Sequence, residues 1–244
     1  MSAASGERLN RFLARRGVAS RRHADELIAA GRVSVNALPA WLGEVVDPAR
    51  DAITLDGAPV AAPLAAPVTF ALNKPAGVVT TARDPQHRPT VFGLVDQAPG
   101  LVAVGRLDAD SRGLLLLTTD GELAHRITHP RFGVHKRYRV TLGSAYRAEQ
   151  LRRLVAGVRI DGRPARAIEA HRGRRSDVIE VVMAEGRRRE VRRLCAAVGL
   201  MVVDLVRVSI GPIALGRLGE GRARRLTDAE DLALRRAVGL SDPD

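Results

Sequence analysis

The stretch GRLDADSRGLLLL, residues 105–117, decides how most of this chain folds, because it sets a charged turn between two apolar runs. The run at residues 101–104 and the leucines at residues 114–117 each have the length of a strand. Asp108 stands in the turn, flanked by arginines, so we expect its carboxylate at the rim of a sheet, where it could act on a ligand. Asp and Ser also close ordinary turns through their own side chains, and Arg commonly pairs with Asp. Taken alone, the stretch favours this structural interpretation, so the rest of the chain has to decide.

Short helices and strands follow one another irregularly around this stretch. Apolar spacing predicts strands at residues 68–72, 78–81, 134–140, 178–183 and 202–208. Helices are predicted at residues 122–127 and 148–155, between residue 187 and the closing Gly199, and after the capping box at residues 227–230. Because strands and helices do not alternate regularly, we expect an α+β domain whose central sheet is mixed and largely antiparallel.

The N-terminal part of the chain has a different pattern. Helical spacing predicts one short helix before Gly17 and a second before Gly31, and strand candidates follow at residues 33–36 and 45–46. The exposed helical positions carry arginines, among them Arg15, Arg16, Arg21 and Arg22. A small ααβ unit with a basic helical face suits the phosphate backbone of a folded RNA. The alternative is the solvated basic face of a purely structural subdomain.

A composition change separates these two parts. Residues 56–67 are rich in Ala and Pro and have no periodicity, which is typical of a semi-extended linker. The sequence therefore predicts a small N-terminal domain at residues 6–55, this linker, and a larger domain at residues 68–244.

The strongest global signal is the charge. The chain of 244 residues has a formal net charge of +12, and so basic a surface binds polyanions, of which nucleic acid is the commonest. Arginines supply almost all of this charge, since Lys74 and Lys136 are the only lysines. Arginine favours planar, bidentate contacts to phosphates and bases.

Several other classes of function lack their motifs. Cys195 is the only cysteine and the six histidines are scattered, so we expect neither a disulfide nor a bound metal. Glycine-rich phosphate loops are absent from the sequence, which argues against nucleotide-driven chemistry. No apolar run reaches membrane-spanning length and the N-terminus has no apolar signal core. We therefore expect a soluble cytoplasmic protein without a membrane partner, and no protein partner is implied.

Two sets of motifs resemble known families. The segments RLNRFLARRGVASRR at residues 8–22 and AAGRVSVN at residues 29–36 resemble the S-four-type RNA-binding module, although Ala37 stands where that module usually has glycine. A second set spreads over the rest of the chain and comprises LNKPAG at 72–77, RPTVF at 88–92, GRLD at 105–108, TTDGEL at 118–123, KRY at 136–138 and EGRRREVRRL at 185–194. This second set is similar to the Rsu-type pseudouridine synthases, which modify ribosomal RNA. The resemblance spans nearly the whole chain.

The resemblance implies a role for each of several residues. Asp108 would be the catalytic aspartate, which attacks the ribose C1′ or abstracts a sugar proton while the uracil detaches, rotates and rejoins through C5. Tyr138 would stack on the flipped uracil, and Leu205 would form an apolar wall of the base pocket. Arg192 would pair with Asp108 and keep it ionised. Asp110 would only shape the turn.

Other residues are expected to contact the RNA, and the reaction is expected to need no cofactor. Arg106 would contact RNA or support the catalytic loop, and further contacts are expected from Lys74, Arg187, Arg188 and Arg189. The isomerisation changes no redox state, consumes no water and transfers nothing to a second substrate.

The target RNA is predicted from one segment. Residues 185–193 are most similar to the B-type members, which act on large-subunit RNA, whereas small-subunit members more often have His-Gln in place of Arg189 and Glu190. We therefore expect a uridine of large-subunit ribosomal RNA as the substrate. The alternatives are a synthase for small-subunit RNA, a non-catalytic RNA-binding factor in ribosome assembly and, more distantly, a metal-dependent nuclease.

Overall fold

The computed structural model describes residues 6–19, 21–60, 66–82, 84–96, 98 and 100–240. It divides the chain into two compact units. The N-terminal unit holds the described residues up to Val68 together with those of the ranges 97–102 and 118–121, and the C-terminal unit holds the other described residues. No helix of the described residues combines the length and the apolar character that crossing a bilayer requires.

The N-terminal unit packs two helices on small sheets. The helices are α1 (Leu9–Arg15) and α2 (Arg21–Ala29), as the helical spacing predicted. Four strands of the described residues form one sheet in the order β3 (Leu38–Pro39), β2 (Val33–Val35), β5 (Ile53–Leu55) and β6 (Ala58–Pro59). A further pair consists of β1 (Glu7–Arg8) and β4 (Val45–Val46). Leu9, Phe12, Leu13, Leu27 and Ile53 share one apolar core.

Two tight hairpins shape this unit. Asn36 and Ala37 (φ 51° and 67°) join β2 to β3, and Asp56 and Gly57 (φ 51° and 79°) join β5 to β6. Positive φ at both central residues defines the type I′ turn, whose twist matches that of antiparallel strands. The predicted start of the linker at residue 56 is therefore wrong: Asp-Gly is a strong hairpin signal, and strand β6 follows it. Residues 61–65 of the predicted linker lie outside the described residues.

We expect Ala37→Gly to stabilise the N-terminal unit. A residue with a Cβ in the left-handed region costs about 1 kcal/mol, and Ala37 adopts that region at φ 67°. The free energy of unfolding, measured by urea denaturation, should rise by about 1 kcal/mol. Ala58→Gly in strand β6 is the matched control and should lower it, because glycine weakens a strand. Equal losses in both variants would contradict the turn assignment.

One mixed sheet organises the C-terminal unit. In the described residues its main path runs β13 (Glu169–Arg172), β14 (Val178–Met183), β10 (Lys136–Leu142), β15 (Val202–Ile210), β9 (Arg112–Thr118), β7 (Thr69–Lys74) and β17 (Ala223–Arg225). Two short strands extend it, β8 (Val102–Val104) beside β9 and β16 (Ile213–Ala214) beside β15. Strand β15 pairs antiparallel with β10 and parallel with β9. The predicted α+β class with a mixed, largely antiparallel sheet is confirmed.

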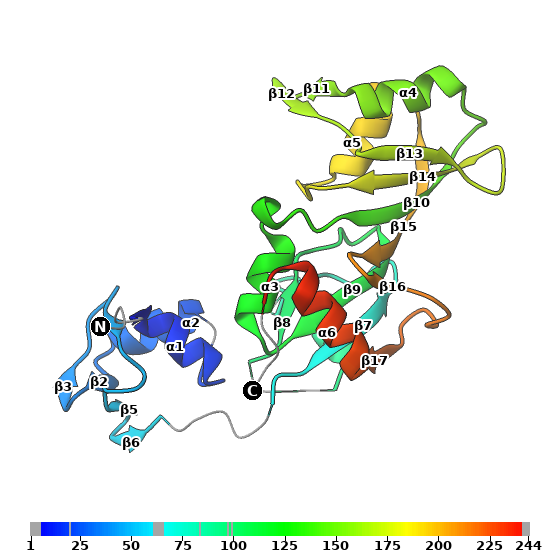
Figure 1. The fold of residues 1–244 in the computed structure, drawn as a ribbon. Helices are drawn as coiled ribbons and strands as arrows, with labels where there is room; N and C mark the ends of the chain where they lie inside the picture. Colours follow the sequence, from blue (N-terminus) through cyan, green and yellow to red (C-terminus); the bar gives the residue numbers. More distant parts are fainter. Residues whose placement is uncertain are drawn as a thin grey trace. The chain divides into compact units, whose positions relative to one another are not determined.

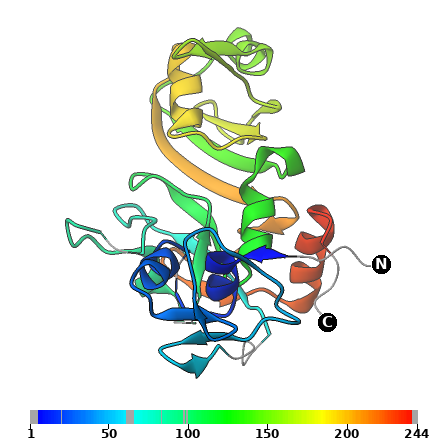
Figure 2. The same cartoon turned by 90° about the vertical axis from the view of Figure 1, so that its left-hand side faces the viewer.

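Helices pack against both halves of this sheet (Figure 1 and Figure 2). Helices α3 (Gly121–Thr128) and α6 (Asp228–Ala237) share a core with the leucines of β9, and the predicted capping box of Thr227 and Glu230 begins α6. Helix α4 (Ala148–Ala156) packs on β13, and α5 (Glu190–Ala197) packs on β15 and on the hairpin of β11 (Val158–Ile160) and β12 (Arg163–Ala165). Two single 3₁₀ turns are η1 (Val91–Leu94) and η2 (Pro130–Phe132).

Two predicted elements differ from the structure. Residues 78–81 do not form a strand of the sheet, because Val79 exchanges backbone hydrogen bonds with Pro89 and Val91 in an isolated bridge instead. The helix expected after residue 187 begins only at Glu190, because Arg189 takes a left-handed conformation with φ 52°. The second of these segments lines the cavity described below, and Thr80 of the first is hydrogen-bonded to Leu107 in its wall.

Candidate active site

Three neighbouring strands bring the site residues into one row. Tyr138 on β10 lies opposite Arg207 on β15, and Arg207 lies opposite Gly113 at the start of β9. Adjacent strands are only about 4.8 Å apart, so a side chain on one strand contacts those on the next. The β10–β15 register shifts between Arg137 and Tyr138, an irregularity that commonly re-aims side chains near active sites. The loop with Asp108 directly precedes β9, so it reaches the same row.

Gly113 makes this close approach possible. A Cβ at this position would lie 2.4 Å from the carbonyl oxygen and 2.7 Å from the amide nitrogen of Arg207. Its φ of 102° is also a conformation that residues with a side chain rarely adopt. The glycine that ends the charged turn therefore lets the Asp108 loop run directly into β9 beside β15.

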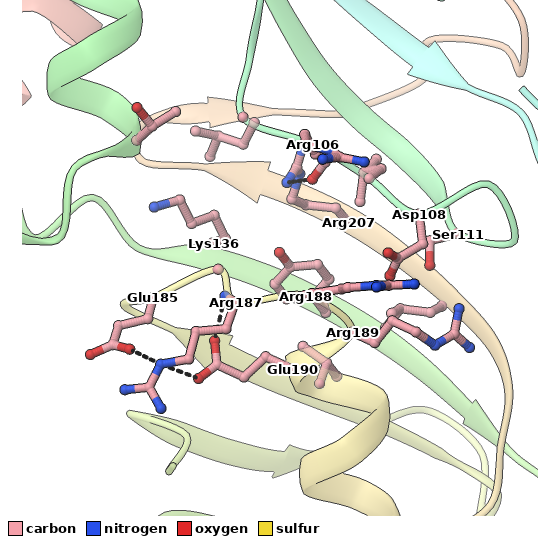
Figure 3. Close-up of a pocket in the computed structure, with 18 of the residues that line it drawn as sticks. Arg106, Asp108, Ser111, Lys136, Glu185, Arg187, Arg188, Arg189, Glu190 and Arg207 are labelled. Atoms are coloured by element: carbon pink, nitrogen blue, oxygen red, sulfur yellow. Dashed lines mark hydrogen bonds and ion pairs between the residues drawn. The ribbon is translucent and has the colours of Figure 1, made fainter. Parts of the chain in front are cut away.

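A cavity of about 290 Å³ opens above this row. Seven of the residues that the sequence singled out line it, namely Arg106, Asp108, Tyr138, Arg187, Arg188, Arg189 and Leu205. Figure 3 shows Asp108 and Ser111 on the loop before β9, with Arg188 and Arg189 reaching towards them from the segment before α5. Six cationic side chains and three carboxylates line the cavity, so it attracts an anionic ligand.

The Asp108 loop is held by backbone and side-chain contacts around it. The backbone oxygen of Asp108 accepts a hydrogen bond from the Ser111 amide at 3.0 Å. The hydroxyl of Thr80 donates to the carbonyl of Leu107 at 2.9 Å and accepts from the Leu107 amide at 3.3 Å. Thr80 belongs to the segment that does not join the sheet, and these bonds place Asp108 at the cavity.

Lys74 supports this loop from beneath, and its predicted contact with RNA is wrong. The side chain is fully buried, with 0% of its surface exposed. Its Nζ donates to the carbonyl oxygens of Pro75 (2.9 Å), Ser111 (2.8 Å) and Ala109 (3.4 Å), which uses all three protons. Burial lowers the pKa of Lys74 to about 8, although the charges of Asp110 and Asp108 oppose that shift. Lys74 therefore holds the turn and is out of reach of a ligand.

Arg192 pairs with Asp110, not with Asp108 as predicted. Its Nε lies 3.4 Å from the Asp110 carboxylate and its Nη2 donates to the Asp110 carbonyl at 3.0 Å. Arg189 adds two hydrogen bonds to the same carboxylate, at 3.1 and 2.9 Å. Burial raises the pKa of Asp110, but the hydrogen bond from Arg189 and the charges of both arginines outweigh it, so the pKa lies below its usual value. Asp110 thus does more than shape the turn, since it ties the loop to α5.

The segment before α5 is fixed by Glu190, which is almost completely buried. Its carboxylate accepts a hydrogen bond from the Arg187 amide at 2.9 Å, and Glu185 pairs with the Arg187 side chain at 2.8 Å. Two of the three carboxylates at the cavity are therefore engaged with Arg187. Asp108 is the third and is half-buried at the cavity wall.

Two cations of the cavity wall were not predicted as site residues. Lys136 is 9% exposed and its Nζ donates to the carbonyl of Ile127 at 3.3 Å. Arg207 is 4% exposed and donates to the carbonyls of Leu114 at 2.7 Å and Arg106 at 3.3 Å. A signal was present in the sequence, because Lys136 shares one face of its strand with Tyr138 and Val140, and Arg207 follows Leu205 by two residues.

The predicted RNA-contacting arginines of α1 and α2 belong to the N-terminal unit. Arg15 is exposed and pairs with Glu7, and the guanidinium of Arg16 lies 5.0 Å from the centre of the Phe12 ring. Arg21 is exposed, whereas the side chain of Arg22 lies outside the described part of the chain. These residues stay candidate RNA contacts.

Other reactive groups are few in the described residues. They contain no group of three or more His, Cys, Asp or Glu side chains that could hold a metal ion. Burial raises the pKa of the Cys195 thiol to about 12, although the charge of Arg192 opposes it, so this cysteine is a poor nucleophile. Asp108 is therefore the candidate reactive group of the cavity.

Comparison with known proteins agrees with this geometry. A family model described as RNA pseudouridylate synthase matches residues 68–197, and an S4 domain model matches residues 7–41. A relative from Pseudomonas aeruginosa named ribosomal large subunit pseudouridine synthase B is 41% identical over 248 residues, which covers 96% of this chain but only 63% of that protein. A relative of the same name from Bacillus subtilis is 37% identical, with 94% of this chain and 96% of that protein covered.

Comparison with solved structures identifies the same family. This chain superimposes on the crystal structure of a pseudouridylate synthase with a TM-score of 0.68 and 32% sequence identity. The superposition covers 93% of this chain and 99% of the chain in the crystal structure. The resemblance inferred from the motifs is thereby confirmed. This chain belongs to the RNA pseudouridylate synthase family.

Proposed function

We propose that this chain isomerises a uridine of large-subunit ribosomal RNA to pseudouridine in the cavity described above. One observation carries the proposal: Asp108, Tyr138 and Leu205, which come from three different segments, line one basic cavity. Its volume of about 290 Å³ is at the lower end of the range for ligand pockets and suits a single extruded base.

Each of these residues has a role that its position supports. Asp108, at the wall of the cavity, attacks C1′ of the ribose or takes a proton from C2′. Tyr138, which is nearly buried in the centre of the sheet, provides the aromatic face on which the uracil stacks. Leu205, also buried, closes the pocket with an apolar wall. A closed pocket keeps water away from the detached uracil.

The arginines divide into two groups with different tasks. Arg106, Arg187 and Arg188 are exposed at the cavity and contact the phosphates of the RNA. Arg189 and Arg192 act as positioning residues, because they hold Asp110 and through it the Asp108 loop. The N-terminal unit, matched by the S4 domain model, adds contacts through Arg15, Arg16, Arg21 and Arg22.

The choice of large-subunit RNA rests on the relatives and on one segment. The Pseudomonas aeruginosa and Bacillus subtilis proteins are both named for the large subunit. The sequence at residues 185–193 favours the same branch, and part of this segment borders the cavity.

The test is a tritium-release assay on transcripts of both ribosomal RNAs that carry tritium at C5 of uridine. Pseudouridine formation replaces the hydrogen at C5 by the bond to C1′, so release of tritium measures the reaction. We expect release from large-subunit transcripts. Release only from small-subunit transcripts would contradict the target, and no release from either RNA, despite tight binding, would support the non-catalytic assembly factor. Carbodiimide treatment and primer extension would then locate the modified uridine.

A further inference from the structure

Two buried cations lie side by side in the wall of the cavity. Lys136 on β10 and Arg207 on β15 come from neighbouring strands and flank Tyr138, since Lys136 precedes it by two residues on the same face and Arg207 lies opposite it. Figure 3 shows both side chains at the cavity. Whatever stacks on Tyr138 therefore lies close to both charges.

Neither cation is neutralised by a carboxylate within the described part of the chain. Their hydrogen bonds all go to backbone carbonyls, of Ile127 for Lys136 and of Leu114 and Arg106 for Arg207. The Nη2 of Arg207 is buried and has no hydrogen-bond partner among the described residues. Burial and then the charge of Arg207 lower the pKa of Lys136 to about 8, so each charge makes the other less favourable.

Such an arrangement is costly unless a ligand compensates it. Buried charges are normally paired, and a buried donor without a partner is rare in native structures. The hydrogen bonds of the two cations to backbone carbonyls do not use all of their donor protons. Lys136 caps the end of α3 with one bond of 3.3 Å, although an ammonium group has three protons to donate. An anion in the cavity would accept hydrogen bonds from Lys136 and would balance the charge of both groups.

The proposed reaction creates an anion at this place. When the C1′–N1 bond breaks, its electron pair stays with the uracil, whose negative charge spreads from N1 over O2 and O4. If Asp108 attacks C1′, it becomes an uncharged ester, and if it takes the C2′ proton, it becomes an uncharged acid. Either route moves one negative charge from Asp108 to the base. The charge returns to Asp108 when C5 bonds to C1′, after which C5 loses its proton and N1 gains one.

We propose that Lys136 and Arg207 form a cationic subsite that binds the carbonyl oxygens of the detached uracil anion. Lys136 contacts the base, and Arg207 acts mainly through its charge behind it. Fixed charges in a water-excluded site stabilise developing charge far more strongly than they would in water. The subsite therefore speeds the breaking of the glycosidic bond. This inference rests on the proposed isomerisation.

The main test compares Lys136→Met and Lys136→Arg in single-turnover tritium release. Removing one group that stabilises developing charge costs on the order of 100-fold in rate, so Lys136→Met should lose about that much at saturating RNA. The RNA concentration for half-maximal rate should change less than about threefold, because the uncharged bound uracil gains little from the cation. Lys136→Arg should restore most of the rate. Arg139→Met, which removes an exposed cation from the same strand, is the matched control and should behave like the wild type.

The pH dependence provides a readout that a purely structural role would not move. With a pKa of about 8, Lys136 is charged below pH 8 and loses its charge above it, so the wild-type rate should fall as the pH rises through 8. In Lys136→Arg this fall should disappear, because arginine stays charged. The charged groups that share the cavity with Lys136 are Arg106, Asp108, Glu185, Arg187, Arg188, Arg189, Glu190 and Arg207. Lys74, whose pKa is also about 8, lies beneath the loop, and a fall that persists in Lys136→Arg would point to it and overturn the subsite.

The outcomes separate this inference from the function on which it rests. If the wild type releases no tritium, the proposed isomerisation fails. If the wild type is active and Lys136→Met matches it in rate, the isomerisation stands and the subsite is refuted. If Lys136→Met does not fold, as judged by circular dichroism, the pH profile of Lys136→Arg still tests the subsite, because a fall in rate that persists above pH 8 would refute it.

Discussion

Asp108→Asn should abolish the release of tritium from C5 of uridine, lowering the single-turnover rate constant by on the order of 10⁴-fold or more. The amide has the size of the carboxylate but can neither attack C1′ nor accept the C2′ proton. Binding of the RNA transcript, measured by filter retention, should change less than about threefold, because the arginines at the cavity remain. The variant should also melt at the temperature of the wild type, since its backbone contact to Ser111 is unaffected.

Asp110→Asn is the matched control for this prediction. The sequence suggested that it would leave activity largely unchanged, but the structure shows Asp110 bound by Arg189 and Arg192. Loss of this charge loosens the connection between the loop and α5, so we expect a loss of about tenfold, far smaller than at Asp108. Equal losses at both positions would favour a paired-acid or metal-dependent reaction, and an active Asp108→Asn would refute the catalytic assignment.

Gly113→Ala should destabilise the C-terminal unit by about 3–5 kcal/mol, the range of severe packing mutations. The added Cβ would lie 2.4 Å from the carbonyl oxygen of Arg207 and 2.9 Å from Cγ1 of Val206. Neither backbone can yield easily, because β9 and β15 are paired at this point and β10 borders β15 on its other side. The free energy of unfolding from urea titration measures the effect.

Substitutions at two other glycines distinguish the steric clash of the added Cβ from the strain of a positive φ. Gly162 also has a positive φ, of 75°, but a Cβ there meets nothing within 4 Å, so Gly162→Ala should cost only about 1 kcal/mol of strain. Gly121 begins α3 without such a φ and also has free space, so Gly121→Ala should be neutral or stabilising. If Gly113→Ala cost no more than Gly162→Ala, the close approach of β9 and β15 would not be the reason for this glycine.

The pattern of apolar residues determined the elements and the class of the fold. Periodicity identified β10, β14, β15 and α5 with small errors at their ends, because a half-buried strand or helix needs apolar side chains at regular intervals. Periodicity gave a wrong prediction where hydrogen bonds outside the sheet hold the segment. Residues 78–81 are all β-branched, as in a strand, but the Thr80 hydroxyl donates to Leu107 in the Asp108 loop, and the backbone of Val79 pairs with Pro89 and Val91.

The motifs likewise identified Asp108 and the residues around it, but not their partners. From the sequence, Arg192 was assigned to Asp108 and Lys74 to the RNA, and both assignments depend on which side chains meet in space. The structure assigns Arg192 to Asp110 and buries Lys74 under the loop.

By itself, then, the sequence of this protein determined an α+β fold, a strongly basic charge and the aspartate that we propose as the catalytic group. Local order and composition are sufficient for these properties, because they depend on neighbours along the chain. The row of Tyr138, Arg207 and Gly113, and the place of Lys136 beside it, were decided only by the tertiary structure. The order of the strands brings distant residues together, and this order depends on contacts between segments that are far apart in the chain.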